Sequence, residues 1–145
     1  MGKRNTLKLD LKGFDELIYK LDKLGGDVKK ITEDALDRAG ETIGRDTVDA
    51  VQKSNLPAGG KYSKGDTEGS IVKNPKTEWE GMIASIGVGF DYSKPGAGGF
   101  LITGTPRMAP DNALKKIYKQ KRYMSEIQKD MREIFNDEIV RRMEG

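Results

Sequence analysis

The sequence predicts an α+β protein in which a small antiparallel sheet packs against a long helix in the N-terminal half and a C-terminal helix. Residues 1–145 are expected to form a single domain, a usual size for one hydrophobic core. Three observations carry the prediction: a short alternating strand near the N-terminus, a long alanine-striped helix pattern, and a glycine-rich alternating segment at 81–90. Together they favour a sheet covered by helices.

The first elements are defined by their apolar spacing. Leu7, Leu9 and Leu11 alternate with charged residues, which predicts a short strand with one buried face. From Phe14 the apolar residues recur every three or four positions, which predicts an amphipathic helix. The pair at 25–26 is Gly-Gly and is expected to end that helix.

A second, longer helix is predicted from an Asp27 cap to about Ser54. Its apolar stripe consists of Val28, Ile31, Ala35, Ala39, Ile43, Ala50 and Val51. Because alanine is small, the partner of this stripe must approach the helix closely. The acidic residues over the rest of the helix predict a solvated face.

The middle of the chain predicts a loop and a β region. Residues 54–69 contain four glycines and are expected to form a loop that is mobile when the protein is alone. Residues 70–77 and 81–90 read as two strands joined through Glu78-Trp79-Glu80-Gly81. One face of the second strand is apolar and the other is nearly bare, and we expect the alanine stripe to cover the bare face.

The last third predicts one more strand and a helix. Residues 99–105 are expected to form an apolar third strand, and helical spacing runs from 111 to the end of the chain. Pro110 suits the first turn of that helix, where a backbone N–H would have no partner.

Composition and charge exclude several functional classes. The formal net charge of +3 is too small to identify a nucleic-acid-binding protein. The chain has no cysteine and no histidine, which excludes disulfides and thiolate metal sites and removes the commonest general base. No segment approaches the ~20 apolar residues of a membrane helix, so we expect a soluble, non-secreted protein.

Sequence motifs for catalysis are incomplete. Residues 60–65 give G-x-x-x-x-G, but Asp66-Thr67 follow where a phosphate-binding loop needs Lys and Ser or Thr. Ser70 and Lys73 give S-x-x-K without a partner motif, and Glu78 and Glu80 flank Trp79 on an expected turn. We therefore expect no enzyme, no cofactor, no metal and no small-molecule substrate.

Two features suit contact with a partner, and each has a structural alternative. The densest basic cluster consists of Lys115, Lys116, Lys119, Lys121 and Arg122. It is either an exposed helix face or a patch that tracks DNA phosphates. Trp79, the single tryptophan, is either an interface anchor or packs on its own strands.

The third strand is expected to end at a stiff corner. Gly104 lets the strand stop without a side chain in the way, and Pro106 fixes the backbone direction. Arg107 would then project beside a sheet edge. Thr103, Gly104, Thr105, Pro106 and Arg107 therefore form either a subunit contact or a plain connection.

Two short segments carry a resemblance to a known family. Asp66 to Ile71 ends in Gly-Ser-Ile and is similar to a T-G-x-L-x-x-S-I segment, although it is shorter. Residues 99–110, "GFLITGTPRMAP", stand in the place of a Tyr-x-x-Glu-Phe-Gly-Thr segment with a proline-rich turn and a helix entry. Leu101-Ile102-Thr103 stands where the family tends to have Val-Glu-Phe. With the element order, these segments resemble the small head–tail joining proteins of tailed double-stranded DNA bacteriophages, the gene-product-ten type of HK97-like phages.

The resemblance implies a structural assembly protein without catalysis. It would act at the head–tail joint, in the neck or in tail completion, as a ring-forming subunit. Its partners would be other copies of itself, the head-connector and tail proteins, and passing double-stranded DNA, with no membrane. It would be assembled in the bacterial cytoplasm and located in the virion. A DNA-binding accessory protein that uses the cluster at 115–122 is the alternative.

Overall fold

The computed structural model describes residues 5–57, 63–72, 75–106 and 109–144. The strands and helices follow one another in this order: β1 (Asn5–Asp10), α1 (Asp15–Lys23), α2 (Val28–Gln52), α3 (Lys64–Gly69), β2 (Glu78–Glu80), β3 (Ile83–Asp91), α4 (Gly98–Thr103), α5 (Asn112–Lys119) and α6 (Lys121–Glu144).

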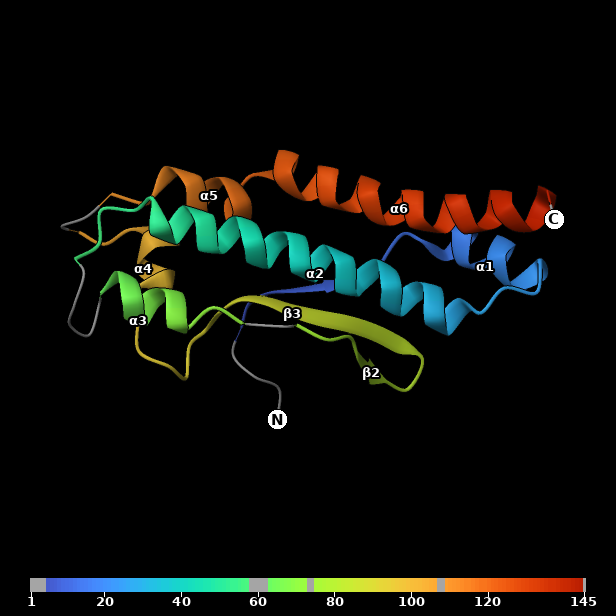
Figure 1. The fold of residues 1–145 in the computed structure, drawn as a ribbon, viewed down its shortest axis with the longest axis horizontal. Coiled ribbons are helices and arrows are strands. Elements are labelled where there is room, and N and C mark those ends of the chain that lie inside the picture. The colour runs from blue at the N-terminus through green and yellow to red at the C-terminus, as the bar shows by residue number, and fades with distance from the viewer. Residues whose placement is uncertain (1–4, 58–62, 73–74, 107–108, 145) are drawn as a thin grey trace.

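The elements stack in layers, with α2 in the middle (Figure 1). The antiparallel sheet, in the order β1-β3-β2, packs on one side of α2. Helix α6 runs alongside α2 in the opposite direction, and α1 packs against the C-terminal part of α6. The predicted α+β class, with a small antiparallel sheet, a long helix in the N-terminal half and a C-terminal helix, is confirmed.

Helix α2 packs closely on two sides. The Asp27 carboxylate accepts a hydrogen bond from the Lys30 backbone N–H at 3.1 Å, which confirms the predicted cap. Ala35 and Ala39 line the crevice shared with α6. On the other side, a Cβ atom added to Gly40 would lie 2.7 Å from Cδ1 of Ile86. Ala35 and Ala39 of the stripe therefore face α6, while Gly40 allows α2 to approach the sheet closely.

The two faces of the sheet differ sharply. Ala84, Ile86, Val88 and Phe90 of β3 are buried on the side that faces α2, as the alternation predicts. The prediction that α2 covers the glycine-rich face of β3 is wrong. We call it the open face because α2 does not cover it and Ile83 is exposed there, although Ser85 and Gly89 are buried.

The open face carries charged residues from both neighbouring strands. Glu80 pairs with Ile83, while Glu78 and Asp10 both pair with Ser85 from opposite sides of β3. Directly opposed residues share a face, so these three carboxylates lie on the open side, and all three residues are exposed.

The third strand predicted at 99–105 is wrong, because residues 98–103 form α4. Strand β1 pairs along most of β3, and β2 pairs with Ile83–Ser85 on its other side, whereas a helix satisfies its own backbone groups without a strand partner. Leu101 and Ile102 are adjacent and both buried. Gly98 packs so closely under the Phe90 ring that an added Cβ would overlap it.

The β region begins later than predicted. Of residues 70–77, Ile71 forms an isolated bridge with Phe90, and residues 73–74 lie outside the described chain. The expected turn at 78–80 is instead strand β2. The segment before β2 is tied to α2, because the Thr77 N–H and hydroxyl both donate to the Asp37 carboxylate at 3.0 and 2.8 Å.

The loop predicted over 54–69 is wrong in its second half. Residues 64–69 form α3, and the buried Ser63 hydroxyl caps it by accepting from the Asp66 N–H at 2.9 Å. Such a cap helps to offset the helix cost of the two glycines in this six-residue segment. Residues 58–62 of the predicted loop lie outside the described part of the chain.

The predicted C-terminal helix is divided in two. Gln120 adopts an extended conformation, with φ −98° and ψ 131°, and separates α5 from α6. Pro110 lies before the cap rather than in the first turn. The cap is Asp111, whose carboxylate accepts from the Leu114 N–H at 3.1 Å.

Two glycines of α2 allow a matched stability test. Gly40→Val should lower the free energy of unfolding by about 1–3 kcal/mol, because the added methyls overpack the contact with Ile86. Gly44→Ala should raise it by about 0.5–1 kcal/mol, since nothing lies within 4 Å of the new Cβ. Urea unfolding measures both. A Gly40→Val variant as stable as the wild type would contradict the close packing.

Candidate functional site

The exposed hydrophobic side chains gather at the two ends of an elongated molecule. Its length is set by α2, whose 25 residues span about 37 Å. We call the end formed by α1, the start of α2, the β2–β3 turn and the end of α6 the turn end. The end formed by α3, α4 and α5 is the corner end (Figure 1).

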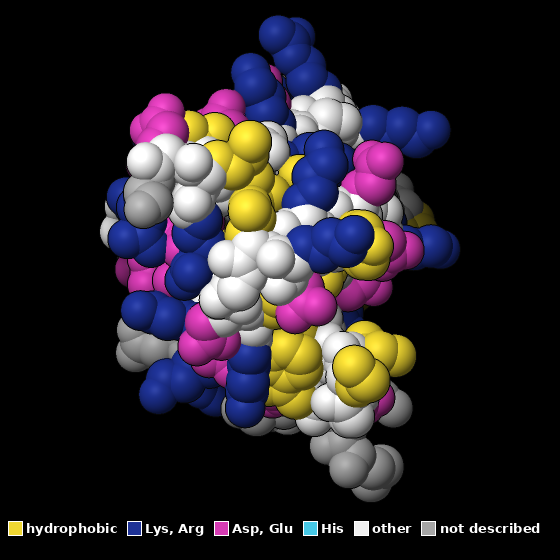
Figure 2. All heavy atoms as spheres, turned by 90° about the vertical axis from the view of Figure 1, so that its right-hand side faces the viewer, with side chains coloured by type: hydrophobic (Ala, Val, Ile, Leu, Met, Phe, Trp, Pro, Cys, Tyr) yellow, Lys and Arg dark blue, Asp and Glu magenta, His cyan; other side chains and the backbone are white. Residues whose placement is uncertain are grey.

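The turn end carries most of the large hydrophobic side chains that the described surface exposes. Six are found there: Tyr19, Leu24, Met82, Ile83, Val140 and Met143. The corner end carries the remaining two, Tyr92 and Phe100. Figure 2 looks at the turn end and shows hydrophobic clusters from its upper to its lower part, with charged side chains between them. Exposed apolar clusters rimmed by charge are typical of protein interaction sites.

An apolar groove of about 670 Å³ opens at the turn end. Five segments form it, and its apolar lining consists of Leu11, Ile18, Val28, Trp79, Met82, Ile83 and Ala84. Met82 is 96% exposed and Ile83 68% exposed, so the β2–β3 turn forms a projecting hydrophobic lip. The remaining described lining side chains are charged or polar and include Asp10, Lys12, Asp15 and Lys29.

Trp79 is a fixed wall of this groove. Its indole N–H donates to the Glu33 carboxylate of α2 at 2.8 Å, and the Lys29 ammonium lies 5.8 Å from the ring centroid. The side chain is half-buried. Trp79 therefore packs onto α2 and also lines the groove. The sequence suggested an interface anchor or packing on its own strands, and neither included this contact with α2.

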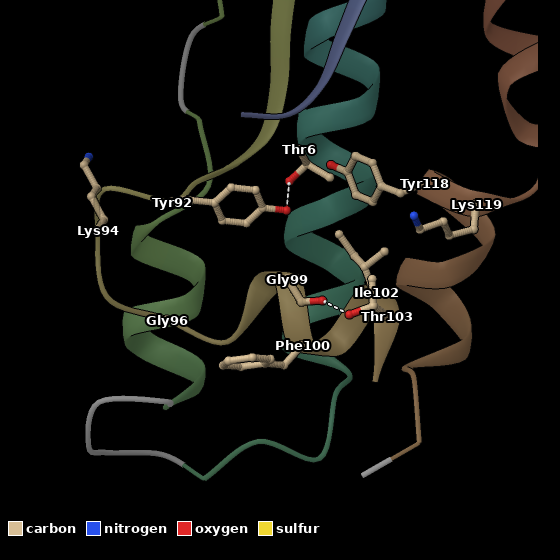
Figure 3. A pocket seen from close by; sticks show the side chains of 10 residues that line it. All are labelled: Thr6, Tyr92, Lys94, Gly96, Gly99, Phe100, Ile102, Thr103, Tyr118 and Lys119. Atoms are coloured by element: carbon tan, nitrogen blue, oxygen red, sulfur yellow. Dashed lines mark hydrogen bonds between the residues drawn. The ribbon is translucent and has the colours of Figure 1, made fainter. Parts of the chain in front are cut away.

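A second cavity, the corner pocket of about 460 Å³, lies at the corner end (Figure 3). Its lining consists of Thr6, Tyr92, Lys94, Gly96, Gly99, Phe100, Ile102, Thr103, Tyr118 and Lys119. The Thr6 hydroxyl donates to the Tyr92 hydroxyl at 3.0 Å. Lys119 reaches in from α5 and Lys94 lies on the opposite rim (Figure 3). No carboxylate belongs to this described lining, so the pocket has a positive rim.

The structure places the predicted corner at the end of a helix. The Thr103 hydroxyl donates to the Gly99 carbonyl at 2.9 Å, and the Gly104 N–H donates to the Phe100 carbonyl at 2.6 Å. Gly104 has φ 79°, a conformation that favours glycine. Thr105 is half-buried, Pro106 is exposed, and Arg107 lies outside the described residues. The glycine thus ends α4 rather than a strand.

The basic cluster lies next to this corner. Lys115, Lys116 and Lys119 are exposed on α5, and Lys121 and Arg122 are exposed at the start of α6. Arg122 approaches Glu126 at 4.0 Å. Lys119 and Thr103 line the same pocket, so the structure brings the basic cluster and the corner together. Trp79 lies at the other end of α2.

The two segments that carry the family resemblance also meet at the corner end. The Thr67 hydroxyl of α3 accepts a hydrogen bond from the Ala97 N–H at 2.8 Å, just before α4. A Cβ atom added to Gly96 would lie 2.9 Å from Cα of Thr67. The segment at 66–71 therefore contacts the residues that lead directly into α4, the helix in which the second segment begins, although about 30 residues separate the two segments in the chain.

Two tyrosines hold the break between α5 and α6 against α2. The Tyr118 and Thr47 hydroxyls lie 2.6 Å apart, and the Tyr123 hydroxyl donates to the Asp46 carboxylate at 2.6 Å. Burial raises the pKa of both tyrosines well above the usual value, and the neighbouring Asp46 carboxylate raises that of Tyr123 further. Both hydroxyls therefore stay neutral and bonded at physiological pH.

Two classes of site are not found in the described part of the chain. No three acidic residues there gather in a way that could hold a metal ion. Among the described helices, none combines the length and the apolar character that crossing a membrane requires.

Comparison with known proteins adds no relative. A scan against protein-family models found no match, and searches of curated proteins and of solved structures found none either. The function is therefore inferred from the geometry of this chain and from the motif resemblance in its sequence.

The pKa of Tyr118 predicts a loss of stability in alkali. Tyr118 of the unfolded chain ionises above about pH 10, while burial keeps the folded form neutral. Its contribution is therefore complete below pH 10 and is lost as the pH rises. When the pH is raised from 9 to 11, the free energy of unfolding should fall by about 1 kcal/mol less in Tyr118→Phe than in the wild type. Tyr19→Phe, on the exposed surface of α1, is the matched control, and equal losses in wild type and Tyr118→Phe would contradict the account.

Proposed function

We propose that this chain is a structural virion assembly protein of a tailed double-stranded DNA bacteriophage. It acts at the head–tail joint, in the neck or in tail completion, as a subunit of a ring. Its partners are further copies of itself and the neighbouring head-connector and tail proteins, and DNA passes through the ring. It is assembled in the bacterial cytoplasm and is located in the virion.

The observation that carries this proposal is the pair of contact surfaces at opposite ends of one rigid helix. A ring of identical subunits needs two different surfaces on each subunit, because its contacts run head to tail. The apolar groove at the turn end and the corner pocket differ in shape, residues and charge. About 37 Å of α2 separates them, so one chain cannot bring its own two surfaces together.

The family resemblance supports the same assignment. Its first segment lies in and just after α3 and its second begins in α4, and Thr67 of the first is bonded to Ala97, which directly precedes α4. This region contributes Ile71, Leu101 and Ile102 to the hydrophobic core, and Phe100 and Thr103 line the corner pocket. A resemblance concentrated beside an exposed pocket supports a role in contact with partners.

Removal of the gene tests the proposal directly. In the phage or prophage that carries it, deletion should give DNA-filled heads beside separate, finished tails, because the joint lacks a subunit. Negative-stain electron microscopy of the lysate measures this, and a plasmid copy of the wild-type gene should restore whole particles. Intact virions in the deletion lysate would refute the proposed role.

A DNA-binding accessory protein is the second candidate, and the exposure of all five cations at 115–122 favours it. A protein that neutralises DNA phosphates loses affinity steeply as salt rises. Lys115→Gln with Lys116→Gln should reduce the slope of log affinity against log salt by up to about 2. Lys20→Gln, on α1 at the other end, is the control. Binding that does not respond to salt would exclude this candidate.

A further inference from the structure

We propose that the groove at the turn end of one copy receives the corner end of the next copy, with Phe100 and Tyr92 packing onto the Met82–Ile83 lip. The inference rests on the proposed function, because it names a second copy of this chain as the partner of the groove. Met82 and Phe100 then lie in one interface although they are on opposite ends of a subunit.

Hydrophobic matching is the first argument. The lip exposes a methionine and an isoleucine beside a groove that is largely apolar. The corner end exposes two aromatic side chains, each 46% accessible. Aromatic rings contribute large contact areas to interfaces, and methionine adapts to irregular surfaces. Joined in this way, Met82 and Ile83 of the turn end would cover the two exposed aromatic side chains of the corner end.

Charge complementarity is the second argument. In the groove lining, Asp10 and Asp15 are balanced by Lys12 and Lys29, while the exposed Glu78 and Glu80 add negative charge beside the lip. The corner pocket has Lys94 and Lys119 on its rim and no carboxylate in its described lining. The acidic side of the lip, formed by Glu78 and Glu80, would therefore meet the positive rim of the corner pocket.

The same charges disfavour the symmetric alternatives. Two grooves facing each other would place Glu78 and Glu80 of one copy near those of the other, and two corners would oppose Lys94 and Lys119 to their own equivalents. Opposed like charges weaken an interface. An acidic lip also fits neither an anionic lipid surface nor nucleic acid. The occupant that matches both the apolar and the charged surface is the other end of this same chain.

The absence of cysteine makes this contact testable by disulfide formation. Met82→Cys and Phe100→Cys are introduced singly and together, and the full-length protein is oxidised with copper–phenanthroline. The oxidation is carried out on purified protein and on particles from phage that carry the variant gene. The double variant should form a covalent ladder of dimers, trimers and higher species, because each subunit offers one thiol to each neighbour.

Two controls separate the expected geometry from others. Each single variant should form no disulfide-linked species. An equal mixture of the two should form disulfide-linked dimers and nothing larger. Met82→Cys combined with Lys129→Cys, on the exposed surface of α6, should give no ladder. Disulfide dimers from Met82→Cys alone would show a symmetric contact and overturn the inference. So would the lack of a ladder in both the purified protein and the particles.

Charge reversal supplies a second, independent measurement. Lys94→Glu with Lys119→Glu should abolish the ladder of the double-cysteine protein, and Glu78→Lys with Glu80→Lys added to the same chain should restore it. The circular dichroism spectrum monitors folding throughout. If the protein with both charge reversals is folded but forms no ladder, the proposed charge pairing is wrong.

The crosslinking and the gene deletion fail independently. Intact virions after deletion would refute the role at the head–tail joint, while a ladder from purified protein would still establish the contact. Separate heads and tails without a ladder would keep the role and overturn this interface.

Discussion

The close contact between Gly40 of α2 and Ile86 of β3 is the constraint on which the rest of the structure depends. A side chain at position 40 would hold the helix away from the sheet, and the neighbouring turns of α2 bury Leu36 and Ile43 completely. The opposite side of α2 is occupied by α6. Buried between two layers, α2 is held straight and in register. The groove and the corner pocket therefore keep a fixed separation.

Elements with strong local signals could be predicted from the sequence. The Asp27 cap and long apolar period define α2, and the alternating leucines define β1. Short apolar segments could not be assigned in the same way, because a run such as 98–103 is compatible with a strand or a helix. The outcome depends on tertiary contacts, here the burial of Leu101 and Ile102 and the packing of Gly98 against the Phe90 ring. Tertiary pairing likewise turned the expected turn at 78–80 into β2.

The candidate sites could be predicted only residue by residue. Trp79, Thr103 and Lys119 were identified from their residue types, but nothing in the sequence indicates that Thr103 and Lys119 share a pocket at the end opposite Trp79. The groove could not be predicted at all, because five separate segments form it. In the sequence, Met82 continues the alternation of β3, and the alternation alone would place it with the buried residues Ala84 and Ile86. It lies one residue before the strand, where the turn at Gly81 directs it outward.

The straight middle layer has a mechanical consequence for an assembled ring. If copies join end to end, successive α2 helices follow one another around the circumference, and each subunit adds about 37 Å or slightly more to its length. The bore is then set by the number of copies, since no flexible connection lies between the two joints of a subunit along α2. Outward pressure on such a hoop would be carried as tension along helices that are packed on both sides, so the channel diameter would change little under load.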